Sequence, residues 1–371
     1  MKNKKGKIIQ FSSKDINQSS LATREHLQTL EVNNLGGESI TFYSNQPFNK
    51  KIIDQCNAII LHEVRSIKRV PKLILIKILF FKENKKFPKI IYDSHDLNKL
   101  NRTIYNASIN KKSKSHAYLQ FLLRYIAEFI LYYFSDLSFH VSKGHQTEQA
   151  SLYKLLSKKI INKSYLYYLV QNISHISSDE ERIFKEKFKG INKYNFNKKI
   201  NSLTYLGTIT KRRIDCSDIL LIREKFKIDI FYFYGPSTNF CDWLNYSKKT
   251  NQKFSNLVES KSLIIIDKGP FDSRDLRNML KRIDCTFIPS FAKGNEQETK
   301  SVLNNKMFIS LSLKVPILYH RTYKSFYEIF AKYSLPIEDT EYLLIFPSIE
   351  VEKKLISLRK HNQEIIASLI Y

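Results

Sequence analysis

The chain has 371 residues, more than a single hydrophobic core usually organises, so two domains of ordinary size are expected. Hydrophobic residues make up 43% of the sequence and charged residues 26%, a globular composition that excludes a disordered or fibrous protein. Lysine and arginine number 61 against 35 aspartate and glutamate residues, and the formal net charge of +26 favours contact with an anionic partner.

Three anionic partners fit this charge: nucleic acid, an anionic membrane surface and phosphorylated small molecules. Much of the excess is lysine mixed with asparagine and isoleucine, which an AT-rich genome also encodes on solvated surfaces. The densest basic runs, 2–7, 82–89 and 111–114, are short, and no nucleic-acid-binding motif accompanies them. Nucleic acid is therefore not an expected partner, whereas a membrane surface and phosphorylated small molecules both stay open.

The cysteines and the apolar segments point to a protein of a reducing compartment. The four cysteines have no close spacing of a zinc or redox site, so buried free thiols are favoured: Cys56, Cys216, Cys241 and Cys285. The N-terminal segment does not resemble a signal peptide. The longest apolar stretch, 119–134, contains an arginine and a glutamate and falls short of the roughly 20 apolar residues of a spanning helix. We expect a buried or amphipathic helix there, and a cytoplasmic protein for which the inner membrane face is a candidate peripheral location.

Short strands alternate with helices along the first half of the chain. Runs of β-branched and apolar residues predict the strands, and longer apolar or amphipathic runs predict the helices. The predicted strands are 7–11, 38–43, 58–62, 89–93, 136–141 and 165–170. The predicted helices are 21–33, 71–81, 119–134 and 142–156. A polar stretch, 174–199, follows and is interpreted as a linker in which Ser-Ser-Asp-Glu-Glu starts a helix.

The second half repeats this alternation. The predicted strands are 202–206, 228–234, 262–266, 285–288 and 315–319. The predicted helices are 215–225, 272–281, 302–313, 323–333 and 349–370. Such alternation implies parallel sheets with right-handed crossovers. We therefore predict an α/β protein with two Rossmann-like domains facing across a cleft. Their expected bounds are 1–173 and 200–348, with a linker at 174–199 and a C-terminal helix at 349–371.

Ligands of open parallel sheets bind at the carboxyl ends of the strands, so the loops there carry the candidate site residues. The first loop of the second half begins with Gly207 and Thr208 and continues into Lys211, Arg212 and Arg213. Glycine permits close backbone approach, a helix N-terminus offers free N–H groups, and basic side chains give charge-assisted bonds. The loop therefore suits a diphosphate, and a glycine turn before a solvated basic helix is the alternative.

Three further loops offer candidates. Gly235 ends the second strand, and Phe271 follows the third and offers a flat apolar wall for a nucleobase. Glu298 lies in a polar loop after the fourth strand, where a carboxylate can bind two ribose hydroxyls, and Lys306 opens the next helix. An ordinary turn, a packing phenylalanine and a solvated glutamate are the alternatives, and they stay open at this point.

Together these loops resemble the donor domain of family 4-like glycosyltransferases, which have the two-domain GT-B fold. The resemblance rests on YLGTITKRRID (205–215), GP (235–236), KGPF with RDLRNMLKRIDCTFIPS (268–290) and NNKMFISLSLKVPIL (304–318). Lys306, Met307, Phe308 and Pro316 match the family's motif P-x-K-[LM]-F-E-Y-L-A-x-G-K-P-V. The family's glutamate is replaced by Ile309 and its glycine by Lys314. The departure at Ile309 removes the usual ribose ligand, for which Glu298 or Glu296 is a candidate replacement.

The first half resembles the same family more loosely. YDSHDL at 92–97 is similar to D-x-H-D-L, in which His95 would face the cleft and bond the donor sugar or transition-state charge. A structural His95 with Asp96 as a helix cap is the alternative. ATR at 22–24 is similar to a variant first loop, in which Arg24 would hold a phosphate of the acceptor or donor.

The resemblance implies a retaining, metal-independent glycosyltransferase without a cofactor. It would move a sugar from a nucleotide-sugar donor to a glycan or lipid-linked acceptor in surface polysaccharide or capsule biosynthesis. Lys211, Arg212 and the Gly207 loop would neutralise the leaving diphosphate, and Lys306 is a further candidate. The alternatives are a non-catalytic GT-B-like partner subunit, which the replacement at Ile309 favours, and a sugar-nucleotide epimerase.

Overall fold

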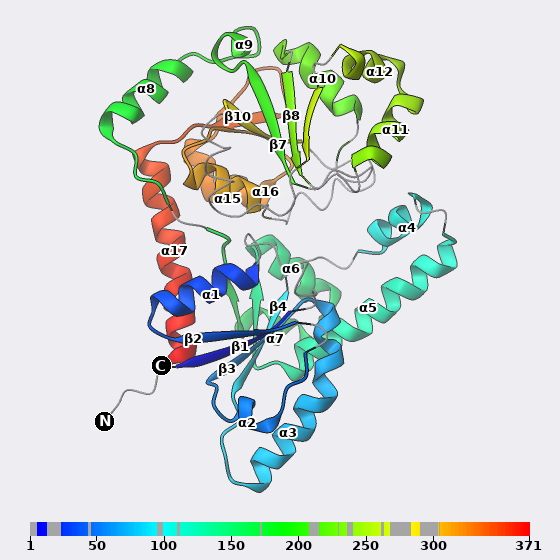
Figure 1. Cartoon of the computed structure of the whole chain (residues 1–371), viewed down its shortest axis with the longest axis vertical. Coiled ribbons are helices and arrows are strands. Elements are labelled where there is room, and N and C mark those ends of the chain that lie inside the picture. The colour runs from blue at the N-terminus through cyan, green and yellow to red at the C-terminus, as the bar shows by residue number, and fades with distance from the viewer. Residues whose placement is uncertain are drawn as a thin grey trace. The chain divides into compact units, whose positions relative to one another are not determined.

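The chain divides into two compact units, Met1–Leu169 with Arg359–Tyr371 as unit 1 and Val170–Leu358 as unit 2. The structure is a computed structural model of the whole chain, and Figure 1 shows it by residue number. It describes residues 6–12, 24–43, 46–94, 99–109, 112–170, 173–207, 214, 216–228, 230–235, 240–260, 263–267, 283–289, 303 and 305–371.

Unit 1 is built on a parallel six-stranded sheet in the order β2-β1-β3-β4-β5-β6. The central strands are continuous apolar runs because both of their faces are covered by helices. The strands are β1 (Lys7–Phe11), β2 (Glu38–Phe42), β3 (Ala58–His62), β4 (Lys89–Ser94), β5 (Leu137–His140) and β6 (Ser164–Leu166).

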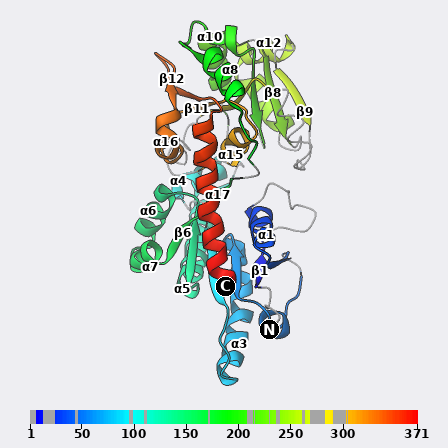
Figure 2. The same ribbon diagram turned by 90° about the vertical axis from the view of Figure 1, so that its left-hand side faces the viewer.

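Different helices cover the two faces of this sheet. One core joins β1, β3 and β4 to α3 (Val70–Lys82) and α5 (Lys114–Phe134). The other core joins β1, β3, β4 and β5 to α1 (Arg24–Asn34) and to the end of α17 (Ile349–Ile370), the continuous red helix of Figure 2. The remaining helical segments are α2 (Lys50–Ile53), η2 (Val64–Arg69), α4 (Leu100–Ile109), α6 (Lys143–Leu152), η3 (Lys154–Leu156) and α7 (Ser157–Asn162).

Unit 2 has a seven-stranded sheet in the order β12-β13-β11-β10-β7-β8-β9. Five of its strands are parallel: β7 (Ser202–Leu206), β8 (Ile230–Gly235), β9 (Leu263–Asp267), β10 (Cys285–Ile288) and β11 (Ile317–His320). The edge strands β12 (Leu335–Pro336) and β13 (Tyr342–Ile345) run antiparallel, a feature that the sequence did not predict. The helical segments are α8 (Ser178–Phe188), α9 (Phe196–Lys199), α10 (Cys216–Phe226), α11 (Phe240–Thr250), α12 (Gln252–Glu259), α15 (Asn305–Ser312), α16 (Lys324–Phe330), η5 (Ala331–Tyr333) and the start of α17.

Most predicted strands are confirmed, and 7–11, 58–62, 202–206 and 285–288 agree to the residue. The strand predicted at 165–170 is wrong beyond Leu166. The side chain of Asn362 on α17 accepts from Tyr168 N at 3.0 Å and donates to Tyr168 O at 2.6 Å, so it takes the bonds that a neighbouring strand would use. The helix predicted at 272–281 lies outside the described residues.

The helix predicted at 142–156 begins where expected, because the Ser142 hydroxyl caps α6 by accepting from His145 N. It is wrong in its length, since α6 ends at Leu152 and a 3-10 turn follows. Tyr153 leaves the helical conformation there and is buried, with its hydroxyl donating to Glu128 Oε2 at 2.6 Å.

The four cysteines are free thiols, but only part of the expected burial is confirmed. Cys216 and Cys285 are buried, Cys56 is partly buried and Cys241 is exposed. Burial raises the pKa of the Cys56 thiol to about 12, so this thiol stays protonated at neutral pH. Among the helices that the structure describes, none is long and apolar enough to cross a membrane.

Candidate functional site

The carboxyl ends of β7 and β8 meet backbone to backbone at two glycines. Leu206 and Tyr234 pair in register, and Gly207 N donates to Tyr234 O at 2.7 Å. Gly207 has a φ of +109°, which side chains rarely allow. A Cβ on Gly235 would lie 2.3 Å from Gly207 O and 2.8 Å from its carbonyl carbon. These strand ends therefore need both glycines, and neither residue brings a side chain that would cover the turn.

Lys306 brings a positive charge to the same glycines. It lies in the first turn of α15 and is only 8% exposed. Its Nζ is 3.7 Å from the centroid of the Tyr205 ring and 3.4 Å from the position that a Cβ on Gly207 would take. The ring face attracts the ammonium, and burial holds it in one place. A buried ammonium beside two glycines suits an anionic group such as a phosphate.

The residue at the position of the glutamate in the family's motif is a buried isoleucine. Ile309 is buried in unit 2, beside a helix-to-strand contact in which the hydroxyls of Ser310 and Thr286 are 2.8 Å apart. Lys314, which stands in the place of the family's glycine, has a φ of +62°, the left-handed conformation that favours glycine after a helix. Its Nζ donates to both carboxylate oxygens of Glu180 at 2.8 and 3.0 Å, and this bond lowers the pKa of Glu180.

Unit 1 has a buried polar cluster at the carboxyl ends of its strands. Asp93, near the end of β4, is fully buried and accepts from Arg24 Nε at 2.7 and 2.8 Å and from Gln28 Nε2 at 2.9 Å. His62 Nδ1 lies 3.0 Å from Asp93 Oδ2. The Arg24 guanidinium also donates to Tyr167 O at 3.1 Å. Arg24 was expected to contact a phosphate. Its Nε instead forms a buried ion pair with Asp93, which connects α1 to β4.

Hydrogen bonds extend this cluster to β1. Gln10 Nε2 donates to the carbonyl of Glu25 at 3.2 Å and to the hydroxyls of Thr29 and Ser39 at 2.8 Å each. Because the amide nitrogen of Gln10 is engaged there, its oxygen faces His62 Nε2 at 2.8 Å and must accept. His62 therefore lies between the amide of Gln10 and the carboxylate of Asp93.

A pair of buried histidines lies at the end of β5. The Nδ1 atoms of His140 and His145 are 3.1 Å apart, and the Ser138 hydroxyl is 3.0 Å from His140 Nε2. Burial, and then the neighbouring His145, hold the pKa of His140 well below its usual value. His140 is therefore a neutral imidazole at physiological pH. This pair was not predicted, although one histidine at a strand end and a second five residues later were visible in the sequence.

Three of the predicted site residues, Gly207, Gly235 and Lys306, come together at one edge of the unit 2 sheet. Tyr205, which holds the Lys306 ammonium, was not among the predicted residues. The other predicted site residues lie outside the described part of the chain: His95, Thr208, Lys211, Arg212, Arg213, Phe271 and Glu298.

No family model matches the sequence, and no curated protein matches it. Several solved structures are similar over nearly the whole chain. HepE of Anabaena, in complex with UDP and glucose, is 10% identical with a TM-score of 0.53, and the match covers 98% of each chain. Sucrose-phosphate synthase of Thermosynechococcus elongatus is 9% identical with a TM-score of 0.51, covering 99% of this chain and 95% of that one. The catalytic domain of starch synthase IV of Arabidopsis thaliana, bound to ADP and acarbose, is 10% identical with a TM-score of 0.51, covering 99% of this chain and 94% of that one.

The similarity extends over both units and therefore concerns the whole architecture. Together with the two mostly parallel sheets, it confirms the fold class predicted from the sequence. The chain has the GT-B fold, built from two Rossmann-like domains.

Proposed function

We propose that this chain is a glycosyltransferase that moves a sugar from a nucleotide-sugar donor to an acceptor. The observation that carries the proposal is the group of Gly207, Gly235 and Lys306, where a buried ammonium lies beside two strand-end glycines. Two structures of similar fold support a nucleotide ligand, since HepE is in complex with UDP and glucose and starch synthase IV is bound to ADP and acarbose.

In the proposed reaction, the bond between the sugar and the diphosphate breaks and the leaving diphosphate gains negative charge. A fixed positive charge near that group stabilises the transition state more than the ground state. Lys306 is the described residue proposed for this role. Lys211, Arg212 and Arg213 are proposed to add to it, together with the backbone of Gly207 and Thr208. Phe271 and Glu298 are proposed for the base and the ribose.

The acceptor side is proposed to belong to unit 1. His95 directly follows β4, whose end carries the buried Asp93, and is proposed to bond the donor sugar or the developing charge. Retention of configuration, independence from metals and a glycan or lipid-linked acceptor of surface polysaccharide biosynthesis in the cytoplasm are part of the same proposal. They are supported by the motif resemblance.

The first experiment asks for nucleotide binding and for turnover. Thermal-shift titration of the full chain with UDP, ADP and GDP, and with their sugar conjugates, should identify the donor. Release of the nucleoside diphosphate in the presence of candidate acceptors then measures turnover. We expect Lys211→Ala or Arg212→Ala to lower kcat by roughly 100-fold, the usual loss of a group that stabilises a developing charge.

Lys253→Ala is the matched control, because Lys253 is exposed on α12 of the same unit. Wild-type turnover in the Lys211→Ala/Arg212→Ala double variant would refute the assignment of these residues to the leaving group. Unchanged turnover and donor affinity in His95→Ala would make that histidine structural.

A non-catalytic partner subunit is the second candidate function, and the burial of Ile309 is the observation that favours it. A chain of this kind would bind a nucleotide without releasing nucleoside diphosphate from any sugar conjugate. An epimerase, the third reading of the sequence, would act on the sugar nucleotide without any acceptor. Among the three, only the transferase releases nucleoside diphosphate in an acceptor-dependent way. Chromatography of the sugar nucleotide after incubation without acceptor separates the other two, because an epimerase converts it into an isomer and a partner subunit leaves it unchanged.

A further inference from the structure

The outward face of α5 is apolar although it faces solvent. The side chains that are exposed on it recur at helical spacing and contain no charge, while Arg124 and Glu128 turn inward and pair with each other. A surface helix normally shows solvent its polar side. The outward side chains are Leu119, Leu122, Leu123, Ile126, Ile130 and Tyr133.

The outward face of α3 is similar. Leu75 is 63% exposed and Phe81 is 83% exposed, and Ile74 and Ile78 lie on the same side of the helix. The inward face holds Leu73, Ile76 and Phe80, which pack in the core of unit 1. Both faces of α3 are thus apolar, so its composition is not explained by the core alone.

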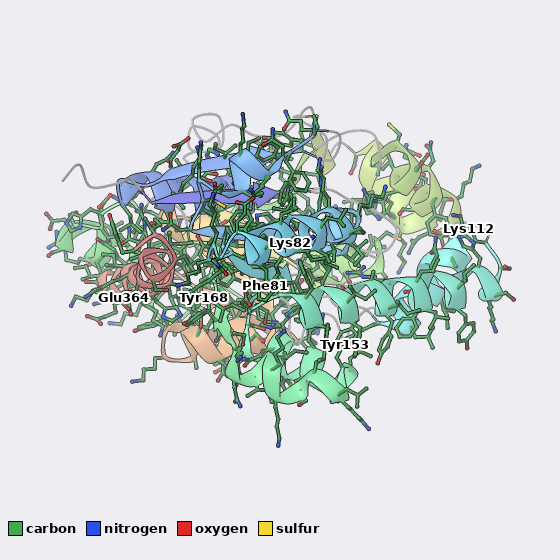
Figure 3. The ribbon with its side chains drawn as sticks, turned by 90° about the horizontal axis from the view of Figure 1, so that it is seen from below. Phe81, Lys82, Lys112, Tyr153, Tyr168 and Glu364 are labelled. Carbon is green, nitrogen blue, oxygen red and sulfur yellow. The ribbon has the colours of Figure 1, made fainter. Side chains whose placement is uncertain are left out.

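These two helices form one layer on the same face of the unit 1 sheet. Both contribute to the same core, and Lys77 Nζ of α3 lies 5.7 Å from the centroid of the Phe134 ring of α5. Figure 3 views unit 1 from below, with Phe81 and Lys82 at the end of α3 and Lys112 just before α5. Next to α5, Lys159 Nζ of α7 donates to Tyr133 O at 2.7 Å, and Leu155 of η3 is 89% exposed. We call the outward side of α3, α5 and η3 the α3–α5 surface.

Basic residues border the α3–α5 surface. Between Val64 and Ile90 the sequence holds nine lysine or arginine residues and a single acidic residue, Glu83. Glu83 is already paired with Lys50 and Lys85. From Tyr153 through Lys163 the sequence holds four lysines and no acidic residue. A partner that fits this surface therefore offers both an apolar region and negatively charged groups.

We propose that the α3–α5 surface binds the surface of an anionic phospholipid bilayer. Helices that lie in a membrane interface insert an apolar face among the acyl chains, and lysines at their border contact the anionic headgroups. Tyrosine is suited to the boundary between the two layers, and Tyr133 lies toward one end of the α5 face. A second copy of this chain is a poorer occupant, because it would bring an equally basic border against this one. The proposal goes beyond the transferase function and does not rest on it.

The test is co-sedimentation of the full chain with sucrose-loaded vesicles. We expect binding to an equal mixture of phosphatidylcholine and phosphatidylglycerol and much weaker binding to phosphatidylcholine alone. The variant Leu75→Gln/Phe81→Gln/Leu123→Gln removes three exposed apolar side chains and should bind at least roughly tenfold more weakly. Lys82→Gln/Lys86→Gln should also weaken binding by roughly tenfold or more, because each lysine near an anionic surface contributes a factor of about five.

Matched controls come from unit 2. Ile183→Gln/Leu221→Gln/Ile356→Gln changes three similarly exposed apolar side chains, and Lys249→Gln/Lys253→Gln changes two exposed lysines. Both control variants should bind like the wild type, and thermal melts verify that every variant is folded.

Three results would overturn the proposal. The first is that the wild type does not bind the mixed vesicles at low salt. The second is that the unit 2 control variants lose as much binding as the α3–α5 variants. In the third, sedimentation velocity finds a wild-type dimer that the triple α3–α5 variant abolishes while its vesicle binding is unchanged, which would make the surface an interface between copies.

Discussion

Replacing Lys306 with methionine isolates the charge at the proposed diphosphate site. Methionine matches the length of lysine and keeps a favourable contact between its sulfur and the Tyr205 ring. The substitution therefore removes the ammonium that lies 3.7 Å from that ring while the packing of α15 stays in place. Because Lys306 is nearly buried, losing its charge also removes a desolvation cost.

The loss of the charge and the retained packing set the expected changes in ligand affinity and in the free energy of unfolding. A hydrogen bond from a charged donor contributes about 1.5–3 kcal/mol, so the affinity for a nucleoside diphosphate should fall by about 10- to 150-fold. The free energy of unfolding should change by less than about 1.5 kcal/mol, as in other volume-conserving exchanges. The variant should thus lose ligand affinity without losing stability.

Isothermal titration with UDP and ADP, compared with uridine and adenosine, measures the effect on the phosphates separately from that on the base. We expect Lys306→Met to weaken only the diphosphates. Lys324→Met is the matched control, since Lys324 opens α16 in the same unit and is exposed. Wild-type affinity of Lys306→Met for UDP and ADP would refute the assignment of the diphosphate to this edge of the sheet.

Three further outcomes follow from the described geometry. Asp93→Asn leaves the buried Arg24 guanidinium without its counter-charge and should lower the free energy of unfolding by roughly 3 kcal/mol. Urea unfolding measures this loss, and an unchanged midpoint would contradict it. The pKa of His140 is depressed in the folded state, so its contribution to stability is complete above the unfolded pKa near 6.5 and is lost as the pH falls below it. His140→Gln should flatten the fall of the melting temperature between pH 7 and 5.5, and a slope as steep as in the wild type would count against this. Gly235→Ala brings a Cβ to 2.3 Å from Gly207 O, so the strand end must shift and the affinity for UDP should fall. Isothermal titration measures this affinity, and a wild-type value would contradict the expectation.

The sequence predicted the architecture because strand and helix alternate with a clear apolar period. Gly207, Gly235 and Lys306 were found for the same reason, as they stand at strand ends and at a helix start. The ring of Tyr205 was not found, since its contact with Lys306 joins residues about a hundred positions apart and arises only when the start of α15 and the strand β7 come together in the folded unit.

The buried ion pair between Arg24 and Asp93 could not be predicted from the sequence either. Arg24 lies at a helix start, where a free arginine and a paired one look the same in the sequence. Only the fold brings its Nε to 2.7 Å from a carboxylate 69 residues away. The end of α6 is a similar case, because neither proline nor glycine follows Leu152 and the burial of Tyr153 decides the geometry.

Helix α17 imposes an order on how this protein is made. Its last turns supply Ile365, Ile366, Leu369 and Ile370 to the core of unit 1, and Asn57 Nδ2 donates to Ile370 O at 3.1 Å. Domains usually fold as units during synthesis, the N-terminal one first. Unit 1 departs from that rule, because the part of one sheet face that α17 covers stays open until the ribosome has translated all of unit 2, although α1 already lies on the same face. A nascent chain therefore carries an incomplete first domain while the second is synthesised, which gives chaperones a defined window in which to act.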